Sequence, residues 1–309
     1  MAKRAVVVGI NDYSIQIPDG KHNLNYCVSD AQAMYQLLVD ALGFDPSQTF
    51  YYGDADASRN NIMQALRYIT SNGEAGDVAC FYFSGHGARL RADPSRPDCD
   101  KFYEAIIPAS GDYISDYEVR AIAEDLPQSV VNFTVILDAC HSGWNHLAAN
   151  GNRCRTVDFD PALIQAMVQF MKTIVPCGIS LQADAPDVDG NVTNVSASDG
   201  TVHCDVSADK NLVPLAKSTL ISACRYDELS WESDNVGHGF LTQSFLDIVN
   251  QSNFQIDYQT LLAQLRDKVS QRITALIATD HPGTTQTPQL MGQQNRMAEG
   301  FLQPWMQSR

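Results

Sequence analysis

Short apolar runs rich in β-branched and aromatic residues most strongly limit what this chain can fold into. They lie at Ala5–Ile10, Thr49–Tyr52, Val78–Phe83, Ala105–Pro108, Phe133–Leu137 and Thr219–Ser222. Helix-length segments separate several of them, at Ser29–Leu42, Ser58–Thr70 and Asp116–Ala123, and each opens with a Ser or Asp that can cap a helix. This alternation predicts an α/β fold with a mostly parallel central sheet and helices on both faces.

The second half of the chain predicts further helices near Pro161–Lys172, at Gly239–Gln251 and from Tyr258 onward. Along the last of these, apolar residues recur every four positions and predict a buried stripe of Leu261, Leu265, Val269, Ile273 and Ile277. The segment 180–211 is rich in Asp, Ser, Gly and Asn and predicts a flexible surface loop. It divides a larger front part, about 1–155, from a smaller back part, about 218–309.

Composition excludes several classes of protein. A chain of 309 residues with 44% hydrophobic content can bury a core without disulfides or metals, and its eight cysteines form no CxxC pair. The formal net charge of -15 argues against nucleic acid and anionic membrane surfaces as partners. Since no run approaches the roughly 18 apolar residues of a membrane span, and the chain opens directly into a strand, we expect a cytoplasmic protein without a cofactor.

Two of the predicted strands end in residues that can carry chemistry. The strand Asp77–Phe83 runs into Ser-Gly-His-Gly, and the strand Asn132–Leu137 runs into Asp-Ala-Cys-His. Functional residues of a parallel sheet gather at the carboxyl ends of its strands. If these strands are neighbours, His86 and Cys140 face each other across one edge of the sheet.

A thiol beside an imidazole is sufficient for acyl transfer, because the imidazole takes the thiol proton and later protonates the leaving amine. The backbone N–H groups of Gly87 and Cys140 can together hold the oxyanion of the intermediate. A single His or Cys at a strand end is more often structural. The combination of His86 with Cys140, in this order, favours catalysis. A flavodoxin-like nucleotide binder lacks support, because no Gly-rich phosphate loop follows the first strand.

The motifs YFSGHG at 82–87 and DACHSG at 138–143 resemble those of the caspase superfamily (peptidase C14 type), and within it the metacaspases and prokaryotic orthocaspases. The resemblance runs from Arg4 to the end of the chain, with 221–225, Glu232 and 239–242 resembling the small-subunit region. It implies one caspase-like domain over 1–309 with the caspase-hemoglobinase fold. It also implies a thiol protease, with His86 and Cys140 as the catalytic dyad. His141 is a rival base, but strand geometry points it away from Cys140.

The residues around the dyad predict the type of residue after which the peptide bond is cleaved. Asp138 lies two positions before Cys140 along a strand, so both side chains project to the same side and a carboxylate stands beside the nucleophile. The resemblance adds Asp30 and Ser84 to a pocket for a basic residue, with Cys27 as a wall. These residues predict cleavage after Arg or Lys. For Asp30, a helix cap is an equally good interpretation.

Three further residues, Ser222, Cys224 and Trp231, either border the substrate groove or simply pack. The segment Asn150–Thr156 carries Arg153 and Arg155 among small and polar residues, and these are candidate sites of self-processing. Equally, they are solvated charges on an ordinary connection.

The expected partners are therefore protein or peptide substrates with a basic residue, and the sequence leaves room for an activating partner or an upstream protease. Two alternatives stay open: a non-catalytic binding protein of the same fold, and a legumain-like or gingipain-like peptidase with another preference.

We expect hydrolysis of arginine peptides to be unaffected when EGTA removes calcium. Many metacaspases need calcium, bound by acidic residues after the histidine and cysteine motifs. Here Asp98 and Asp100 follow the first motif, but Gly143–Leu147 offers no carboxylate, and calcium requires oxygen ligands. Initial rates measured with and without EGTA test this. A steep calcium requirement would contradict it and make Asp98 and Asp100 the first residues to replace.

Overall fold

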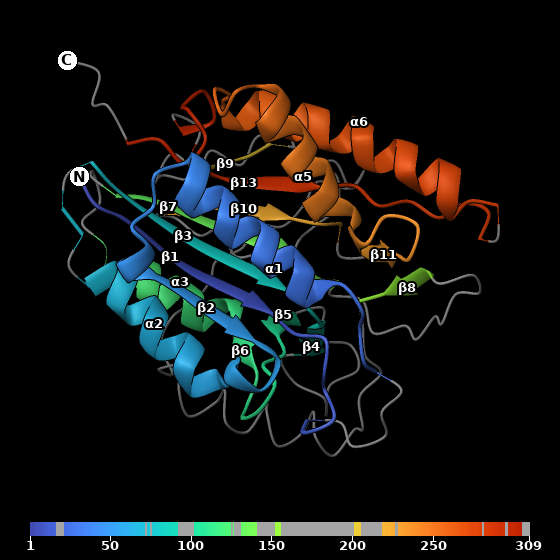
Figure 1. The fold of residues 1–309 in the computed structure, drawn as a ribbon, viewed down its shortest axis with the longest axis horizontal. Helices are drawn as coiled ribbons and strands as arrows, with labels where there is room; N and C mark the ends of the chain where they lie inside the picture. Colours follow the sequence, from blue (N-terminus) through green and yellow to red (C-terminus); the bar gives the residue numbers. More distant parts are fainter. Residues whose placement is uncertain are drawn as a thin grey trace, which may run out of the picture.

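A computed structural model gives the arrangement of the chain in space (Figure 1). It describes residues 1–16, 22–71, 73–74, 76–91, 102–124, 126, 131–140, 152–155, 201–204, 218–225, 228–279, 281–293 and 296–304. Within these ranges, no helix has the length and apolar character that a membrane crossing needs.

The centre is a seven-stranded sheet with the strand order β2-β1-β3-β7-β10-β13-β9. Its strands are β1 (Lys3–Gly9), β2 (Thr49–Gly53), β3 (Asp77–Ser84), β7 (Val131–Asp138), β9 (Thr201–Cys204), β10 (Ser218–Ser222) and β13 (Gln289–Gln293). The strands from β2 to β10 are parallel to one another, whereas β13 and β9 each pair in the antiparallel sense. The predicted mostly parallel sheet is confirmed.

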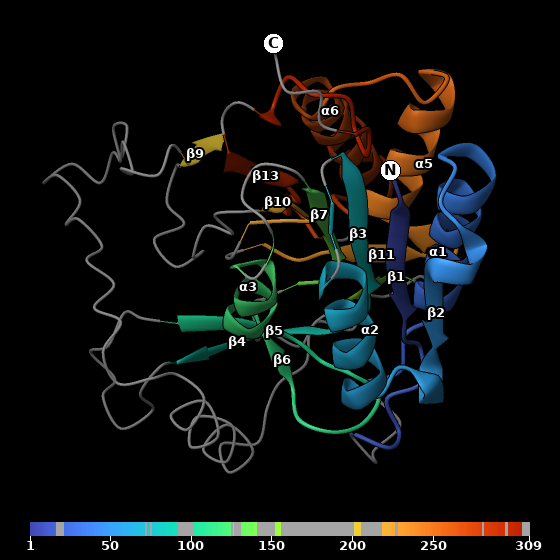
Figure 2. The ribbon, with the colours of Figure 1, turned by 90° about the vertical axis from the view of Figure 1, so that its left-hand side faces the viewer.

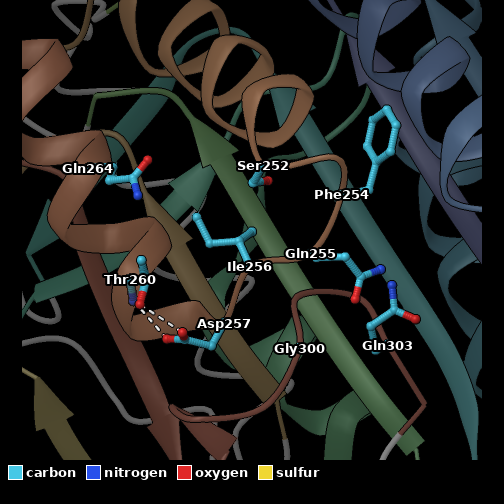
Figure 3. Close-up of a pocket in the computed structure, with 9 residues that line it drawn as sticks. All are labelled: Ser252, Phe254, Gln255, Ile256, Asp257, Thr260, Gln264, Gly300 and Gln303. Atoms are coloured by element: carbon cyan, nitrogen blue, oxygen red, sulfur yellow. Dashed lines mark hydrogen bonds between the residues drawn. The ribbon is translucent and has the colours of Figure 1, made fainter.

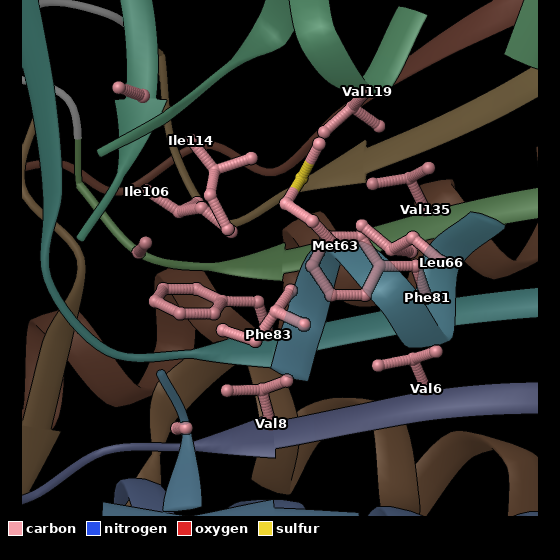
Figure 4. Packing of buried hydrophobic residues seen from close by; sticks show 14 of the residues in the cluster. Val6, Val8, Met63, Leu66, Phe81, Phe83, Ile106, Ile114, Val119 and Val135 are labelled. Carbon is pink, nitrogen blue, oxygen red and sulfur yellow. The ribbon is translucent and has the colours of Figure 1, made fainter. Parts of the chain in front are cut away.

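Helices cover both faces of this sheet, which is why its strands are apolar throughout. In β1, Val6 and Val8 face one side and Ala5 and Val7 the other, and all eight residues of β3 are buried. The first face packs against α2 (Arg59–Ser71) and α3 (Asp116–Glu124), as Figure 4 shows. The second face packs against α1 (Cys27–Gln36), α5 (Phe240–Gln251) and α6 (Tyr258–Leu276), which lie on the opposite side in Figure 2.

Two small sheets flank the central one. The first consists of β4 (Gly87–Arg91), β5 (Phe102–Ile106) and β6 (Ile114–Ser115). The second consists of β8 (Asn152–Cys154), β11 (Trp231–Ser233) and β12 (His238–Gly239). The second sheet therefore joins the front part of the chain to the back part.

Most predicted elements are present, with shifted ends. The stripe of α6 is buried as predicted, and Asp257 caps this helix by accepting a hydrogen bond from the N–H of Thr260 at 2.8 Å. The helix predicted from Ser29 begins earlier, at Cys27, and continues as a π-helical turn over Leu37–Ala41. The predicted loop 180–211 is not a loop throughout, because β9 pairs with β13. The rest of that loop and the helix predicted near 161–172 lie outside the described residues.

Candidate active site

The ends of β3 and β7, which lead to His86 and Cys140, lie side by side. β3 and β7 are paired in parallel, with Ser84 opposite Asp138. The segments that follow these residues, which carry His86 and Cys140, leave the sheet at the same edge. β3 and β7 are therefore neighbours in the sheet, as the prediction required.

A third element, α1, reaches this edge because of a glycine at the end of β1. A Cβ atom on Gly9 would lie 2.2 Å from the carbonyl oxygen of Cys27, a distance that no packed structure tolerates. The bare backbone at Gly9 lets the first turn of α1 come close to β1. Cys27 and Asp30, both fully buried, thereby stand beside the ends of β3 and β7.

The main chain of Arg155 lies across the edge like an added strand. β8, which precedes it, pairs antiparallel with β11, with Cys154 opposite Trp231. The N–H of Arg155 donates to the carbonyl of Ser230 at 3.1 Å. The carbonyl oxygen of Arg155 accepts from the N–H of Gly87 at 3.5 Å and from the N–H of Cys140 at 3.4 Å. A backbone carbonyl thus occupies the position between the two N–H groups that the sequence predicts as an oxyanion hole.

The thiol of Cys140 also contacts Ser230, the residue whose carbonyl accepts from the N–H of Arg155. Its Sγ accepts a hydrogen bond from the N–H of Ser230 at 2.9 Å and lies 3.5 Å from the carbonyl oxygen of Ser230. Ser230 is therefore bonded both to the thiol of Cys140 and to the N–H of Arg155, which fixes the two relative to each other. The buried thiol of Cys224 lies close by, since its hydrogen bond with Cys140, together with burial, raises the pKa of Cys224.

The imidazole of His86 is held by two residues that the sequence did not single out. The Nε2 atom lies 2.6 Å from the carbonyl oxygen of His22, so Nε2 carries the proton and Nδ1 the lone pair. The backbone N–H of His86 donates to the hydroxyl of Tyr13 at 2.8 Å, and the two rings are 4.5 Å apart. Burial lowers the pKa of His86 to about 4, against the opposing effect of the carbonyls of His22 and Arg155. The imidazole is consequently neutral at neutral pH.

The side chain of Arg155 enters a closed pocket that three carboxylates surround. Its guanidinium is fully buried, with Nη2 2.6 Å from Asp30 and 3.3 Å from Glu232, and Nη1 3.0 Å from Asp138. Nη1 also donates to the hydroxyl of Ser84 at 2.8 Å. We call the space bounded by Asp30, Ser84, Asp138 and Glu232 the guanidinium pocket.

The carboxylates of this pocket have their own donors, which are what make so much buried charge tolerable. Asp30 accepts from Ser84, from the Nδ1 of His238 at 2.7 Å and from the N–H of Gly239. The remaining oxygens of Asp138 and Glu232 are bonded as well. Their donors are the hydroxyl groups of Ser230 and Thr242 and the N–H of Thr242 for Asp138, and the N–H groups of Asn25 and Tyr26 for Glu232.

Burial and neighbouring charge act on the three carboxylates to different degrees. Burial by itself raises the pKa of Asp30, but Arg155 and His238 outweigh it, and the pKa lies below its ordinary value. Burial raises the pKa of Asp138, with the nearby charge of Asp30 adding to it, and burial likewise raises the pKa of Glu232. With Arg155 in place, Asp30 is thus the one carboxyl group of these three whose pKa lies below its ordinary value.

The predicted pocket residues thus share one partner. Asp30, Ser84 and Asp138 all contact the guanidinium of Arg155, and Cys27 lies 3.8 Å from Glu232 on the pocket wall. The alternative that Asp30 caps a helix is wrong, because α1 begins at Cys27 and the N-cap residue Tyr26 makes no side-chain capping bond.

Glu232 is the pocket residue that sequence reasoning missed. The sequence pointed to Glu232 only through its resemblance to the small-subunit region, and its burial within Ser230–Ser233 is seen only in the structure. Trp231 pairs with Cys154 of β8, the strand just before Arg155. The hydroxyl of Ser222 bonds the carbonyl of Cys224, which is packing. The side chain of Arg153, together with His141, Asp98 and Asp100, lies outside what the structure describes.

Another hollow in the described part of the molecule lies away from this edge, between the start of α6 and the 300–303 segment (Figure 3). It has a volume of about 370 Å³. Its lining is Ser252, Phe254, Gln255, Ile256, Asp257, Thr260, Gln264, Gly300 and Gln303. Asp257 and Thr260 are already bonded to each other there as the cap of α6, so this hollow offers no nucleophile with a base.

A parallel α/β sheet whose neighbouring strands end in a histidine and a cysteine defines a caspase-like class of protein. Comparison with known families agrees, since the caspase domain of peptidase C14 matches residues 2–298. The chain belongs to this family.

Relatives among known proteins are metacaspases. The chain is 35% identical to Metacaspase-4 of Arabidopsis thaliana over 148 residues, which is 46% of this chain and 34% of that protein. It is 24% identical to Metacaspase-1 of Schizosaccharomyces pombe over 300 residues, which is 91% of this chain and 68% of that protein. The chain spans about a third of the length of the plant relatives it matches. The crystal structure of protein GSU0716 from Geobacter sulfurreducens shares the fold, with a TM-score of 0.63, 20% identity and coverage of 99% of this chain and 100% of that one.

The burial of Arg155 predicts resistance to trypsin. In a Cys140→Ala chain, the bond after Arg155 should stay intact under mild trypsin treatment, because the guanidinium that trypsin must bind is fully buried. Mass spectrometry of the fragments measures this. Replacing both Asp30 and Asp138 by Asn in the same background should release Arg155 and expose the bond. Rapid cleavage after Arg155 in the folded Cys140→Ala protein would show that the guanidinium is not held in the pocket.

Proposed function

We propose that this protein is a cysteine endopeptidase that hydrolyses peptide bonds after arginine or lysine, with Cys140 as nucleophile and His86 as base. One observation supports this above all others. The carbonyl of Arg155 accepts from the N–H groups of Gly87 and Cys140, while its guanidinium lies among three carboxylates. A segment of the chain itself has the contacts that a substrate needs, at both its reacting atom and its side chain.

The chemistry follows from these contacts. The Nδ1 of His86 takes the thiol proton, and the Sγ of Cys140 attacks the carbonyl carbon of the substrate. The N–H groups of Gly87 and Cys140 stabilise the oxyanion that forms. His86 then donates the proton to the leaving amine, so that the C–N bond breaks and a thioester remains. Water hydrolyses the thioester and restores the thiol.

Charge explains the preference for a basic side chain at the cleaved residue. Three buried carboxylates are costly without a cation, and a guanidinium satisfies several of their oxygens at once. An acidic side chain would bring a further negative charge into the same closed space. Family membership supports the peptidase class, and the guanidinium pocket supports the basic preference.

We further propose that the protein cleaves itself between Arg155 and Thr156. Arg155 and Cys140 belong to the same chain, so the reaction is intramolecular and benefits from a high effective concentration. Arg153 is a poorer candidate, because its backbone pairs with Glu232 within the β8–β11 ladder, away from the two N–H groups. For another arginine to enter the guanidinium pocket, Arg155 must leave it after the bond is cut.

Self-cleavage predicts two fragments, one ending at Arg155 and one beginning at Thr156. Cys140→Ala and His86→Ala should leave the chain whole, since each removes a reacting group from the edge of the sheet without removing core. Arg155→Gln should also stay whole, and Arg153→Gln should be cut as the unchanged chain is. Denaturing gels with terminal mass measurement decide this, and the rate constant should not depend on protein concentration. Normal peptide turnover by a folded Cys140→Ala protein would refute the assignment of the nucleophile.

The pocket acids predict the loss of arginine cleavage. Asp30→Asn and Asp138→Asn should each lower kcat/KM for arginine peptides by an amount equivalent to about 2–4 kcal/mol, because each leaves a buried charge without its partner. Asp267→Asn, an exposed acid on α6, is the matched control and should have no effect. Peptides with aspartate at the cleaved position should stay at background in every variant. Preferential cleavage after aspartate would overturn the proposed specificity.

A further inference from the structure

Gly239 closes the far end of the guanidinium pocket, at the junction of β12 and α5. Its backbone has φ -64° and ψ 147°, an extended conformation that any residue adopts without strain. Conformation therefore does not call for a glycine at this position. The reason for the missing side chain must be space.

The space that a side chain on Gly239 would need is already filled. A Cβ atom there would lie 2.5 Å from Nη2 and 2.6 Å from Nη1 of Arg155, and 2.5 Å from an Oδ2 of Asp138. These distances are all shorter than real Cβ contacts. The two terminal nitrogens of the guanidinium rest against the bare Cα of Gly239.

We propose that Gly239 sets the depth of the pocket and makes the enzyme prefer arginine to lysine. This inference rests on the proposed function and deepens it. A lysine side chain ends one atom earlier than an arginine side chain, so its ammonium stops short of the space beside Gly239. It also has one terminal nitrogen where arginine has two, and here Nη1 bonds Asp138 while Nη2 bonds Asp30. A pocket with this floor holds the longer, forked cation with more of its hydrogen bonds made.

The same geometry predicts how a shallower pocket would change the binding of arginine and of lysine. In a Gly239→Ala chain, the added methyl carbon would lie 2.5 Å from Nη2 and 2.6 Å from Nη1, so an arginine cannot reach full depth. A lysine, being shorter, loses less. The methyl group also collides with Asp138. Because Asp138 bonds the Nη1 atom that a lysine lacks, this collision adds to the loss for arginine.

The test compares two peptides that differ only in arginine or lysine at the cleaved position. In Gly239→Ala, kcat/KM for the arginine peptide should fall by about 100-fold, and the ratio of arginine to lysine kcat/KM should fall at least about tenfold. Gly237→Asn is the control two residues away, where φ is +75°, a Cβ meets nothing within 4 Å, and asparagine tolerates positive φ. It should keep both the rates and the ratio.

Each outcome has a distinct meaning. An unchanged ratio in folded Gly239→Ala overturns the role of Gly239, while arginine cleavage by the unchanged enzyme leaves the proposed function intact. Absence of cleavage after either residue by the unchanged enzyme would instead sink the proposed function. Should Gly239→Ala fail to fold, Arg155→Lys provides a second measurement with Gly239 in place. Its self-cleavage should be at least about tenfold slower than that of the unchanged chain, and an equal rate overturns the proposed depth.

Discussion

The site of this protein depends on a fully buried guanidinium that is paired with three carboxylates. A charge removed from water is tolerated only when partners replace the lost hydration, and here each carboxylate also has donors of its own. Asp30 comes from α1, Asp138 from the end of β7 and Glu232 from β11. Because the three elements are far apart in the sequence, satisfying one cation holds the front and back parts of the chain together around it.

The main chain of the same arginine is held by backbone hydrogen bonds in addition to the contacts of its side chain. Pairing of β8 with β11 aligns residues 152–154, and Ser230 extends that ladder to Arg155. The carbonyl of Arg155 thereby lies within reach of the N–H groups of Gly87 and Cys140. Backbone pairing thus positions the carbonyl of Arg155, whereas the guanidinium pocket holds its side chain.

Sequence periodicity predicted the framework well because the signals are local. A run such as Ala5–Ile10 is apolar at consecutive positions only if both faces of its strand are covered, and two helical layers do cover them. The predicted ends of the helices and strands were less accurate. The helix expected from Ser29 begins at Cys27, where the side chain of Asn11, distant in the sequence, accepts hydrogen bonds from the N–H groups of Cys27 and Val28. The strand β9 was missed, since its pairing partner β13 lies far along the chain and leaves no local trace.

By itself the sequence determined the α/β alternation, the strands that lead to His86 and Cys140, and one acid, Asp138, near them. Those features follow from residue type and spacing along a single strand or helix. Only the tertiary structure decided that Glu232 completes the pocket, that Gly239 forms its floor, and that Arg155 rather than Arg153 fills it. These are contacts between segments distant in sequence, fixed by how the sheet edge, α1 and the β8–β11 pair meet in space, and no pattern along the chain encodes that meeting.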